Sequence, residues 1–497
     1  MLENVPILSL MLLFPLIGAV VTFLLGNNFR LAKLSALIFS AMPLALSLLM
    51  LTEYVQTAGG YQFREAFTWI DALGIQYILG VDGISVPMVF LTALLVFLAV
   101  IFSWDIGYRT NQYMALMLVL ELGVLGVFMA LDYFVFYIFW EVVLIPMYFL
   151  IGVWGGPRRA YSAIKFFIYT HIASLVMLLG IFALYFEAAS VNGYYSFGME
   201  TINAVSPFFG QTFQMAVFGA LFFGFAVKMP MFPFHTWLPD AHVEAPTAGS
   251  VLLAGLLLKM GAYGIIRIAL PALPSGAEDW QWIMVIMAIL SIVYGALMCL
   301  AQKDLKKMVA YSSISHMGIV LLGFATFTEL GIAAGVFQMF AHGLITAVLF
   351  MICGVVQHKA GTRNIPRLGG LASKMPYAAT FMMIGFLASL GLPGMVGFVA
   401  EFSVFTATYD AFGWLLLVPV ISVAITAAYY IWAMQRSLFG PLTKEVDVEH
   451  LHDVNWYESL PLAVLSGLIV LFGMLPGLVL DYIRPALGTV MGLLGGI

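Results

Sequence analysis

Charged side chains are scarce in this sequence. Only 9% of its 497 residues are Asp, Glu, Lys or Arg, whereas 63% are hydrophobic and the mean hydropathy is +1.04. A soluble domain carries roughly 25% charged residues. This chain therefore has too little charge to cover a water-facing surface of its size, and the composition predicts a membrane protein.

Cysteine is almost absent as well. Cys299 and Cys353 are the only two, and each lies in an apolar run. This spacing does not suggest a disulfide framework, an iron–sulfur cluster or a structural zinc site, and no dinucleotide-binding fingerprint occurs. We therefore expect no cofactor and no metal in this chain. The net charge of −5 is diluted over a long chain and gives no indication of nucleic-acid binding.

We expect no removable leader at the start of the sequence. The segment MLENVPILSLMLLFPLIGAVVTFLLGN has no basic beginning and no small-residue cleavage site. It is typical of a first membrane span rather than of a signal or transit peptide.

Apolar runs of spanning length recur along the whole chain. A spanning helix needs about 20 apolar residues, and we expect about fourteen of them with no water-soluble domain. The expected spans lie near 5–25, 31–52, 84–104, 112–130, 133–153, 162–186, 210–234, 247–270, 281–301, 305–327, 331–356, 377–408, 412–438 and 458–480. The short apolar end at 486–497 is expected to lie at the membrane interface.

Basic residues collect in alternate loops, which predicts the orientation. One side carries Arg30, Lys33, Arg109, Arg158, Arg159, Lys303, Lys306, Lys307, Lys359, Arg363, Arg367, Lys374, Arg436 and Lys444. The other side carries Arg64 and Arg484, with Arg267 near the end of span 8. Because positive loops stay on the side of synthesis, the first side is predicted to be cytoplasmic and both termini to face the periplasm.

Titratable side chains occur inside several spans. They are Glu121, Glu141, Lys228, Lys259, His316, His342 and Glu401, with Lys165 and His171 on span 6. A charge inside a membrane is costly unless it is paired or hydrated, so such residues usually face the bundle interior and carry function. A static pair that holds helices together is the simpler alternative. The presence of both signs and of imidazoles on many spans favours a proton-transfer path.

Helical spacing places several of these groups on polar stripes. Gln338, His342 and Thr346 share one face of span 11, and Ser312 and His316 share one face of span 10. Such a stripe is typical of a hydrated seam between helices, although hydrogen bonding between helices by small polar residues is also common.

Two spans contain helix-breaking residues near a titratable group. Pro230 and Pro233 follow Lys228 in span 7 and deprive the carbonyls of Ala226 and Met229 of their usual donors. Gly391, Pro393 and Gly394 precede Glu401 in span 12. Broken helices at corresponding places in two halves indicate inverted repeats around an ion pathway.

These breaks suggest how the chain is organised. We expect an all-α fold forming one membrane domain over 1–497, in which two inverted five-helix repeats are preceded by spans 1–3. The expected parts are 1–111, 112–270 for spans 4–8, 281–438 for spans 9–13, and 458–497. Span 5 then corresponds to span 10, and span 7 to span 12, so that Lys228 corresponds to Glu401.

Four segments resemble a known family. They are AVKMPMFPFHTWLPDAHVEAPTAGSVLLAGLLLKMGAYGIIR, FVFYIFWEVVLIPMYFLIGVWGG, KKMVAYSSISHMGIVLLG and GLPGMVGFVAEF. They resemble the antiporter-like membrane subunits of respiratory complex I, NADH-quinone oxidoreductase, and most closely the subunit M branch, the counterpart of mitochondrial NADH dehydrogenase subunit 4. The carboxylate of Glu401 favours this branch, because related subunits usually carry lysine there.

The resemblance implies roles for individual residues. Glu141 is similar to the carboxylate partner of the first half, Lys228 to its broken-helix lysine, and Lys259 to the central lysine. His316 and His342 are similar to connecting imidazoles, and Glu401 to the terminal proton carrier. Glu121 and His171 match no assigned family residue, and we treat them, together with Lys165, as weaker candidates.

The same resemblance implies partners and a location. NADH, FMN, iron–sulfur clusters and quinone would be bound by partner subunits, and this chain would contribute a non-redox proton pump. It would contact L-like and N-like antiporter subunits, the peripheral arm and lipids in a bacterial cytoplasmic (inner) membrane.

Three other functions fit parts of the sequence. One is a subunit of a multisubunit sodium/proton antiporter, against which Glu401 argues, or of a membrane-bound hydrogenase. Another is a cytochrome with His316 and His342 as axial haem ligands. The third is a metal site formed by His235, Asp240, His242 and Glu244, for which surface hydrogen bonding is the simpler explanation.

Overall fold

The computed structural model describes residues 5–26, 28–57, 59–443 and 451–494. Within these ranges, 12 helices are long and apolar enough to cross a membrane. This confirms a nearly all-helical membrane protein. Lys444, expected in a basic loop, and the last residues of the 486–497 stretch lie outside the described ranges.

The order of the elements follows the expected spans. The first are α1 (Ile7–Leu24), α2 (Phe29–Glu53), β1 (Gln62–Ile70), β2 (Ile75–Val81), α3 (Ser85–Phe102), α4 (Thr110–Met129), α5 (Tyr133–Val142) and α6 (Leu144–Trp154). There follow α7 (Arg159–Asn192), α8 (Met199–Val205), α9 (Gln211–Lys228), α10 (Trp237–Glu244), α11 (Thr247–Leu252), α12 (Leu258–Gly264), α13 (Leu270–Ala272) and α14 (Pro274–Leu300). The last are α15 (Leu305–Ala325), α16 (Glu329–Ala360), α17 (Pro376–Ser389), α18 (Val396–Phe412), α19 (Leu417–Leu438), α20 (Trp456–Met474) and α21 (Gly477–Leu493).

The predicted number of spans, about fourteen, exceeds the twelve helices for two reasons. The first half of span 7 is α9, which is polar at both ends and is not among the twelve. In addition, α18 and α19 follow each other as one long apolar stretch, Val396–Leu438, while α17 is a shorter apolar helix.

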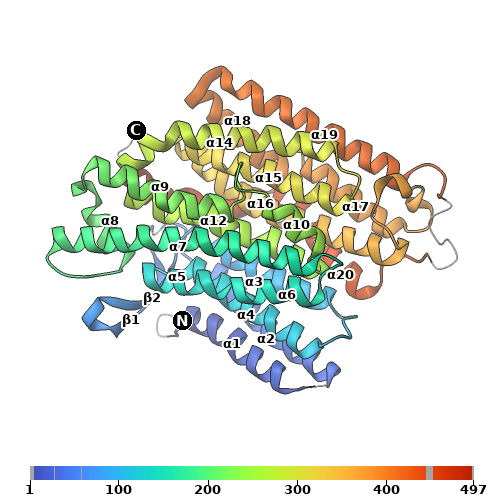
Figure 1. The fold of residues 1–497 in the computed structure, drawn as a ribbon, viewed down its shortest axis with the longest axis horizontal. Coiled ribbons are helices and arrows are strands. Elements are labelled where there is room, and N and C mark those ends of the chain that lie inside the picture. The colour runs from blue at the N-terminus through green and yellow to red at the C-terminus, as the bar shows by residue number, and fades with distance from the viewer. Residues whose placement is uncertain (1–4, 27, 58, 444–450, 495–497) are drawn as a thin grey trace.

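The centre of the bundle is made of helices that are buried on all sides. Figure 1 shows α1 and α2 along one edge of the molecule and α18 and α19 along the opposite edge, with α12, α15 and α16 between them. Every residue of α11, α12 and α13 is buried except Thr247, and so is almost every residue of α15 and α16. A helix that is apolar all round belongs in such a core.

The loop between α2 and α3 forms an antiparallel β-hairpin, which the sequence analysis did not predict. Strands β1 and β2 pair with Glu65 opposite Leu79 and Phe67 opposite Tyr77. The carboxylate of Glu65 accepts hydrogen bonds from the backbone N–H groups of Leu8 (2.8 Å) and Ser9 (3.1 Å). These are unsatisfied donors at the start of α1, so the hairpin caps the first helix.

Both predicted helix breaks are present. Helix α9 ends at Lys228, and the N–H of Met231 donates to the Ala226 carbonyl (2.9 Å), replacing the donor that Pro230 lacks. Between α17 and α18 the chain turns through Gly391 and Gly394, whose φ angles are +81° and +91°. Only glycine adopts such angles readily.

Further irregularities were not predicted. Span 8 is interrupted by two π-helical turns, Leu253–Leu257 and Ile265–Ala269, on either side of α12. Span 5 is divided between α5 and α6 at Val143, close to Pro146. The expected terminal span ends early: α20 stops at Met474, and the separate helix α21 follows, with Val479, Ile483, Leu487 and Val490 buried along one face.

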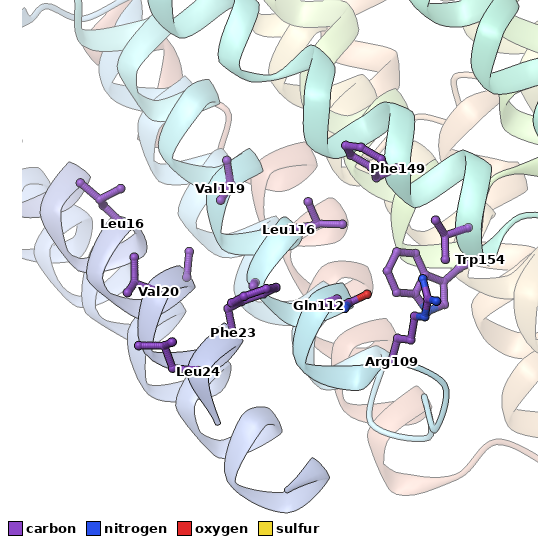
Figure 2. Close-up of a pocket in the computed structure, with 13 residues that line it drawn as sticks. Leu16, Val20, Phe23, Leu24, Arg109, Gln112, Leu116, Val119, Phe149 and Trp154 are labelled. Atoms are coloured by element: carbon purple, nitrogen blue, oxygen red, sulfur yellow. The ribbon is translucent and has the colours of Figure 1, made fainter. Parts of the chain in front are cut away.

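The outer surface of α1, α4 and α6 contains an apolar groove (Figure 2). Leu16 and Val20 of α1 face Leu116 and Val119 of α4 across it, and Phe149 of α6 adds a ring. The groove is separate from the titratable groups of the spans.

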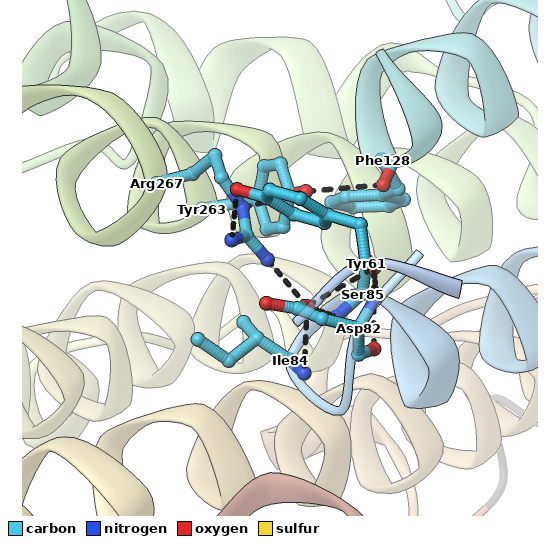
Figure 3. Close-up of polar contacts among 7 residues, drawn as sticks. All are labelled: Tyr61, Asp82, Ile84, Ser85, Phe128, Tyr263 and Arg267. Carbon is cyan, nitrogen blue, oxygen red and sulfur yellow. Dashed lines mark hydrogen bonds and ion pairs between the residues drawn. The ribbon is translucent and has the colours of Figure 1, made fainter. Parts of the chain in front are cut away.

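A buried ion pair fixes the C-terminal end of span 8 (Figure 3). The guanidinium of Arg267 pairs with Asp82, which also accepts hydrogen bonds from the backbone N–H groups of Ile84 (3.0 Å) and Ser85 (3.1 Å) at the start of α3. Arg267 donates to the hydroxyls of Tyr263 (3.1 Å) and Tyr61 (3.0 Å).

Tyr61 lies outside the spans, and burial raises the pKa of its phenol, which therefore stays neutral and accepts from Arg267. The cluster thus joins span 8 to the start of α3 and to the loop before β1.

We predict that Arg267→Leu destabilises the protein by about 3–5 kcal/mol, because it leaves the Asp82 carboxylate buried without its partner. The free energy of unfolding in detergent, from a denaturant titration, measures this. The matched control is Arg64→Leu, since Arg64 pairs with Glu200 at 2.9 Å but both side chains are 48% exposed. That pair should contribute at most about 1 kcal/mol. Equal losses in the two variants would contradict the prediction.

Candidate functional site: a buried row of titratable groups

Lys259 and His342 form a direct contact in the centre of the bundle. The Lys259 ammonium nitrogen lies 2.7 Å from His342 Nδ1, and it also donates to the backbone carbonyl of Ala254. Ala254 belongs to the first π-helical turn of span 8. A π turn shifts the backbone hydrogen bonds from i+4 to i+5 donors. The irregularity thereby leaves the Ala254 carbonyl oxygen available as an acceptor for the buried ammonium group.

His342 continues the row toward α15. Its ring lies 5.6 Å, centroid to centroid, from the ring of His316. Among the described residues, His342 Nε2 has no hydrogen-bond partner. The two imidazoles therefore lie next to each other without a direct hydrogen bond.

His316 reaches the break in span 12. Its Nδ1 lies 2.7 Å from the Ser312 carbonyl oxygen and its Nε2 lies 3.0 Å from the Ser389 carbonyl oxygen. Nε2 is also 3.4 Å from Glu401 Oε1. Both ring nitrogens can donate together only when the imidazole carries a positive charge. The site is therefore shaped for an imidazolium–carboxylate pair.

The break itself exposes the acceptor that His316 uses. Ser389 is the last residue of α17, so its carbonyl has no partner inside that helix. The Ser389 hydroxyl donates to Tyr430 (2.9 Å), and the Tyr430 hydroxyl donates to Ser312 (2.8 Å). These contacts attach the broken end to α15 and α19.

Lys228 is buried but stands apart from this row. Its ammonium has no hydrogen-bond partner among the described residues. It lies 5.3 Å from the ring centroid of Trp140 and 5.9 Å from that of Phe166. Aromatic faces attract a cation and lower the cost of burying it. No described contact joins Lys228 to Lys259.

Glu141 lies at the edge of the bundle. Its carboxylate accepts from the Ser174 hydroxyl and lies 3.1 Å from His171 Nδ1. The Glu141 side chain is 25% exposed and that of His171 is 38% exposed, in a groove between α5 and α7. The resemblance implied that Glu141 is the carboxylate partner of the first half, and in the part of the chain that the structure describes it forms no ion pair with Lys228.

The two ends of this set of titratable residues differ in how far their side chains are exposed. Glu401 and His316 side chains are only 7% and 5% exposed, whereas Glu141 and His171 open onto the outer surface. The first half therefore has a surface-accessible carboxylate, and the second half has an enclosed one.

The three weaker candidates have different surroundings. His171 contacts Glu141, so it is part of the same surface-accessible group. Lys165 forms an ion pair with Asp240 (2.7 Å) and is remote from the row. Glu121 is buried, and neither carboxylate oxygen has a partner within the described ranges.

Neither of the cofactor alternatives gains support from the geometry. No group of three or more His, Cys, Asp or Glu side chains that could hold a metal occurs among the described residues. Glu244 accepts from the Arg158 backbone N–H (2.8 Å), and the His242 ring stacks on Phe350. Both nitrogens of His316 face oxygen atoms, which leaves none for haem iron.

Several participating groups were missed by the sequence analysis. Ser174 was detectable, because it follows His171 by three residues on the same helix face. Asp82 was not, because its partner Arg267 is distant in sequence. The π turns beside Lys259 have no proline or glycine pattern that distinguishes them.

Comparisons with known proteins agree with this architecture. Residues 130–426 match the family described as NADH:quinone oxidoreductase/Mrp antiporter, TM. The F(420)H(2) dehydrogenase subunit M of Methanosarcina mazei is 44% identical over 480 residues, 96% of both chains. The NADH-quinone oxidoreductase subunit M of Rhodobacter capsulatus is 41% identical over 490 residues, 97% of this chain and 95% of that one.

The chain belongs to the NADH:quinone oxidoreductase/Mrp antiporter transmembrane family. It is a subunit-M-type member, and the resemblance noted in the sequence is confirmed.

Solved structures place the fold in the same family. A chain of the respiratory complex I from Thermus thermophilus with bound NADH matches with a TM-score of 0.89 and 30% identity, over 98% of this chain and 100% of that one. A chain of the Mrp complex from Dietzia sp. has a TM-score of 0.87 at 21% identity, over 99% of both chains, and shows the shared fold alone. The family member described here is thus a membrane subunit of antiporter-like fold.

We predict that Gly391→Ala destabilises this family member by about 2 kcal/mol. The left-handed conformation alone costs roughly 1–2 kcal/mol for a residue with a Cβ atom, and that atom would lie 3.1 Å from Glu401 Oε2. The control is Gly361→Ala, which has φ +69° and no atom within 4 Å, so only the conformational cost applies. Denaturant titration of both purified variants measures the difference. A loss no larger than that of Gly361→Ala would show that Gly391 does not constrain Glu401.

Proposed function

We propose that this chain is the proton-translocating M-type subunit of an NADH:quinone oxidoreductase complex, in which partner subunits carry out the redox chemistry. The observation that carries the proposal is the buried row from Lys259 through His342 and His316 to Glu401. Buried titratable groups in contact across several spans are typical of proton relays.

The second half of the path begins at Lys259. Its ammonium can donate a proton directly to His342 Nδ1 over 2.7 Å. Transfer from His342 to His316 covers more than one hydrogen bond and needs a bridging water molecule. His316 then passes a proton to Glu401 through Nε2, 3.4 Å from Oε1.

The first half of the path contains Glu141 and Lys228. A negative charge on Glu141 stabilises the charged form of Lys228, although the two do not touch. When Glu141 is neutralised, the buried ammonium loses this support and releases its proton toward Lys259. The Trp140 ring beside Lys228 keeps the lysine in place during this change.

The energy for this cycle would come from other subunits. NADH, FMN, iron–sulfur clusters and quinone would be bound there, and the chain itself would supply only proton-carrying side chains. Neighbouring L-like and N-like subunits and a peripheral arm would complete the complex. It would lie in a bacterial cytoplasmic membrane with both termini of this chain on the periplasmic side.

We predict that Glu401→Gln reduces proton translocation at least tenfold while the complex still assembles, because glutamine cannot take up a proton in this role. The measurement is quinone reduction together with the pH gradient in proteoliposomes that contain the whole complex. The control is Glu121→Gln, since Glu121 is an equally buried carboxylate outside the row.

Glu121→Gln should leave the pH gradient per electron unchanged. A normal gradient in Glu401→Gln would rule out the proposed path. An equal loss in both variants would point to general damage by removal of a buried carboxylate rather than to a relay.

A second candidate differs in the electron donor. The relative with 44% identity is a subunit of an F(420)H(2) dehydrogenase, so the same pump module could operate with F(420)H(2) in place of NADH. We expect the affinity-purified complex to oxidise NADH and to reduce quinone. Oxidation of F(420)H(2) but not NADH would establish the second candidate, and oxidation of neither would favour an antiporter or hydrogenase complex.

A further inference from the structure

The groove on α1, α4 and α6 is apolar along its length and polar at one end (Figure 2). Its apolar part includes Val20 and Phe23, both 54% exposed, and Phe149, 44% exposed. These side chains belong to helices that cross the membrane, so they face acyl chains or a partner rather than water. The groove is hollowed enough to hold an apolar chain between α1 and the α4–α6 pair.

Arg109, Gln112 and Trp154 gather at the polar end (Figure 2). The Trp154 indole N–H donates to the Tyr108 carbonyl (2.8 Å), which fixes the indole beside the loop. The Arg109 guanidinium carbon lies 5.4 Å from the Tyr108 ring centroid. Arg109 has a φ of +48°, an uncommon conformation for a residue other than glycine.

Positive charge at this end is not neutralised by the chain. Among the described residues, no carboxylate pairs with Arg109, whose described contact is the Tyr108 ring. Arg159 donates to the carbonyl of Val153, a residue that lines the groove (3.3 Å), and likewise has no acidic partner in the described ranges. The neighbouring Arg158 differs, because Asp240 and Glu244 lie within 3.8 and 3.7 Å of it.

The chemistry of this end matches a phospholipid headgroup. Arg109 and Arg159 belong to the basic loops, which the charge bias assigns to the cytoplasmic side. Anionic lipids attract basic residues next to the membrane there. Guanidinium groups bind phosphate oxygens with two parallel hydrogen bonds, and tryptophan favours the level of the headgroups.

We propose that this groove binds one anionic phospholipid of the cytoplasmic leaflet. The phosphate contacts Arg109, and one acyl chain lies between Val20 of α1 and Leu116 of α4. A protein partner fits less well, because it would have to bring a carboxylate to the edge of the membrane.

The bound lipid would also attach α1 more firmly to the bundle. At this end α1 is joined to α4 by a hydrogen bond from the Asn111 side-chain amide to the Phe23 carbonyl (3.0 Å). A lipid in the groove adds apolar contacts on the outer side of the same junction.

The test uses the purified whole complex, delipidated in mild detergent and incubated with phosphatidylglycerol or phosphatidylcholine. Native mass spectrometry then counts the lipids retained by this subunit. We expect one phosphatidylglycerol to be retained in preference to phosphatidylcholine. Arg109→Gln should reduce that preference on the order of fivefold. Val20→Trp, which fills the groove from an exposed position, should abolish retention of both lipids.

Two control substitutions lie outside the groove. Arg30→Gln removes a charge on the same side of the membrane, and Ile38→Trp adds an indole to the exposed face of α2, where Ile38 is 52% exposed. Both should retain lipid as the unmodified complex does. An equal effect of Arg30→Gln and Arg109→Gln, or no effect of Val20→Trp, would overturn the proposal. It would also be overturned if Val20→Trp releases another protein subunit instead of a lipid.

Discussion

The cost of placing a charge in an apolar interior governs this structure more than any other constraint. Four of the buried charged residues have local solutions of their own. Arg267 is paired with Asp82, Lys228 lies against aromatic rings, Lys259 reaches a backbone carbonyl, and Glu401 faces His316. These solutions differ in strength. Arg267 also donates to Tyr61 and Tyr263 and is suited to a structural role, whereas the Lys228 ammonium and His342 Nε2 have no hydrogen-bond partner among the described residues.

Irregular backbone supplies much of this compensation. A membrane helix normally uses all its backbone groups internally, so a carbonyl becomes available to a side chain only where the helix is disturbed. Here the π turn offers the Ala254 carbonyl to Lys259, and the end of α17 offers the Ser389 carbonyl to His316. The disturbances therefore lie where the titratable groups need an acceptor. A regular helix at either place would leave the charged form without a backbone partner.

Much of the fold could be predicted from the sequence, because hydropathy and helix-breaking residues are local signals. The breaks after Lys228 and before Glu401 followed from proline and glycine. The residues of the buried row from Lys259 to Glu401 were also singled out by their type and by their position within the spans. The hairpin and the π turns were not, because they are local departures for which hydropathy gives no clear pattern. The Asp82–Arg267 pair was not, because it depends on contact between distant segments. The contact of Glu141 with His171 depends on side-chain direction, which spacing alone does not determine.

The capping of α1 by Glu65 has a consequence for how the protein is made. During synthesis the first helix is complete long before residue 65 emerges, so its Leu8 and Ser9 N–H groups must wait for a partner until α2 has been inserted. Asp82 waits longer for its partner, because Arg267 belongs to span 8 and is synthesised much later. The end of the bundle that holds Glu65 and Asp82 therefore gains its final contacts only after several spans have been synthesised. Until then the first helix lacks this cap, and Asp82 lacks its partner.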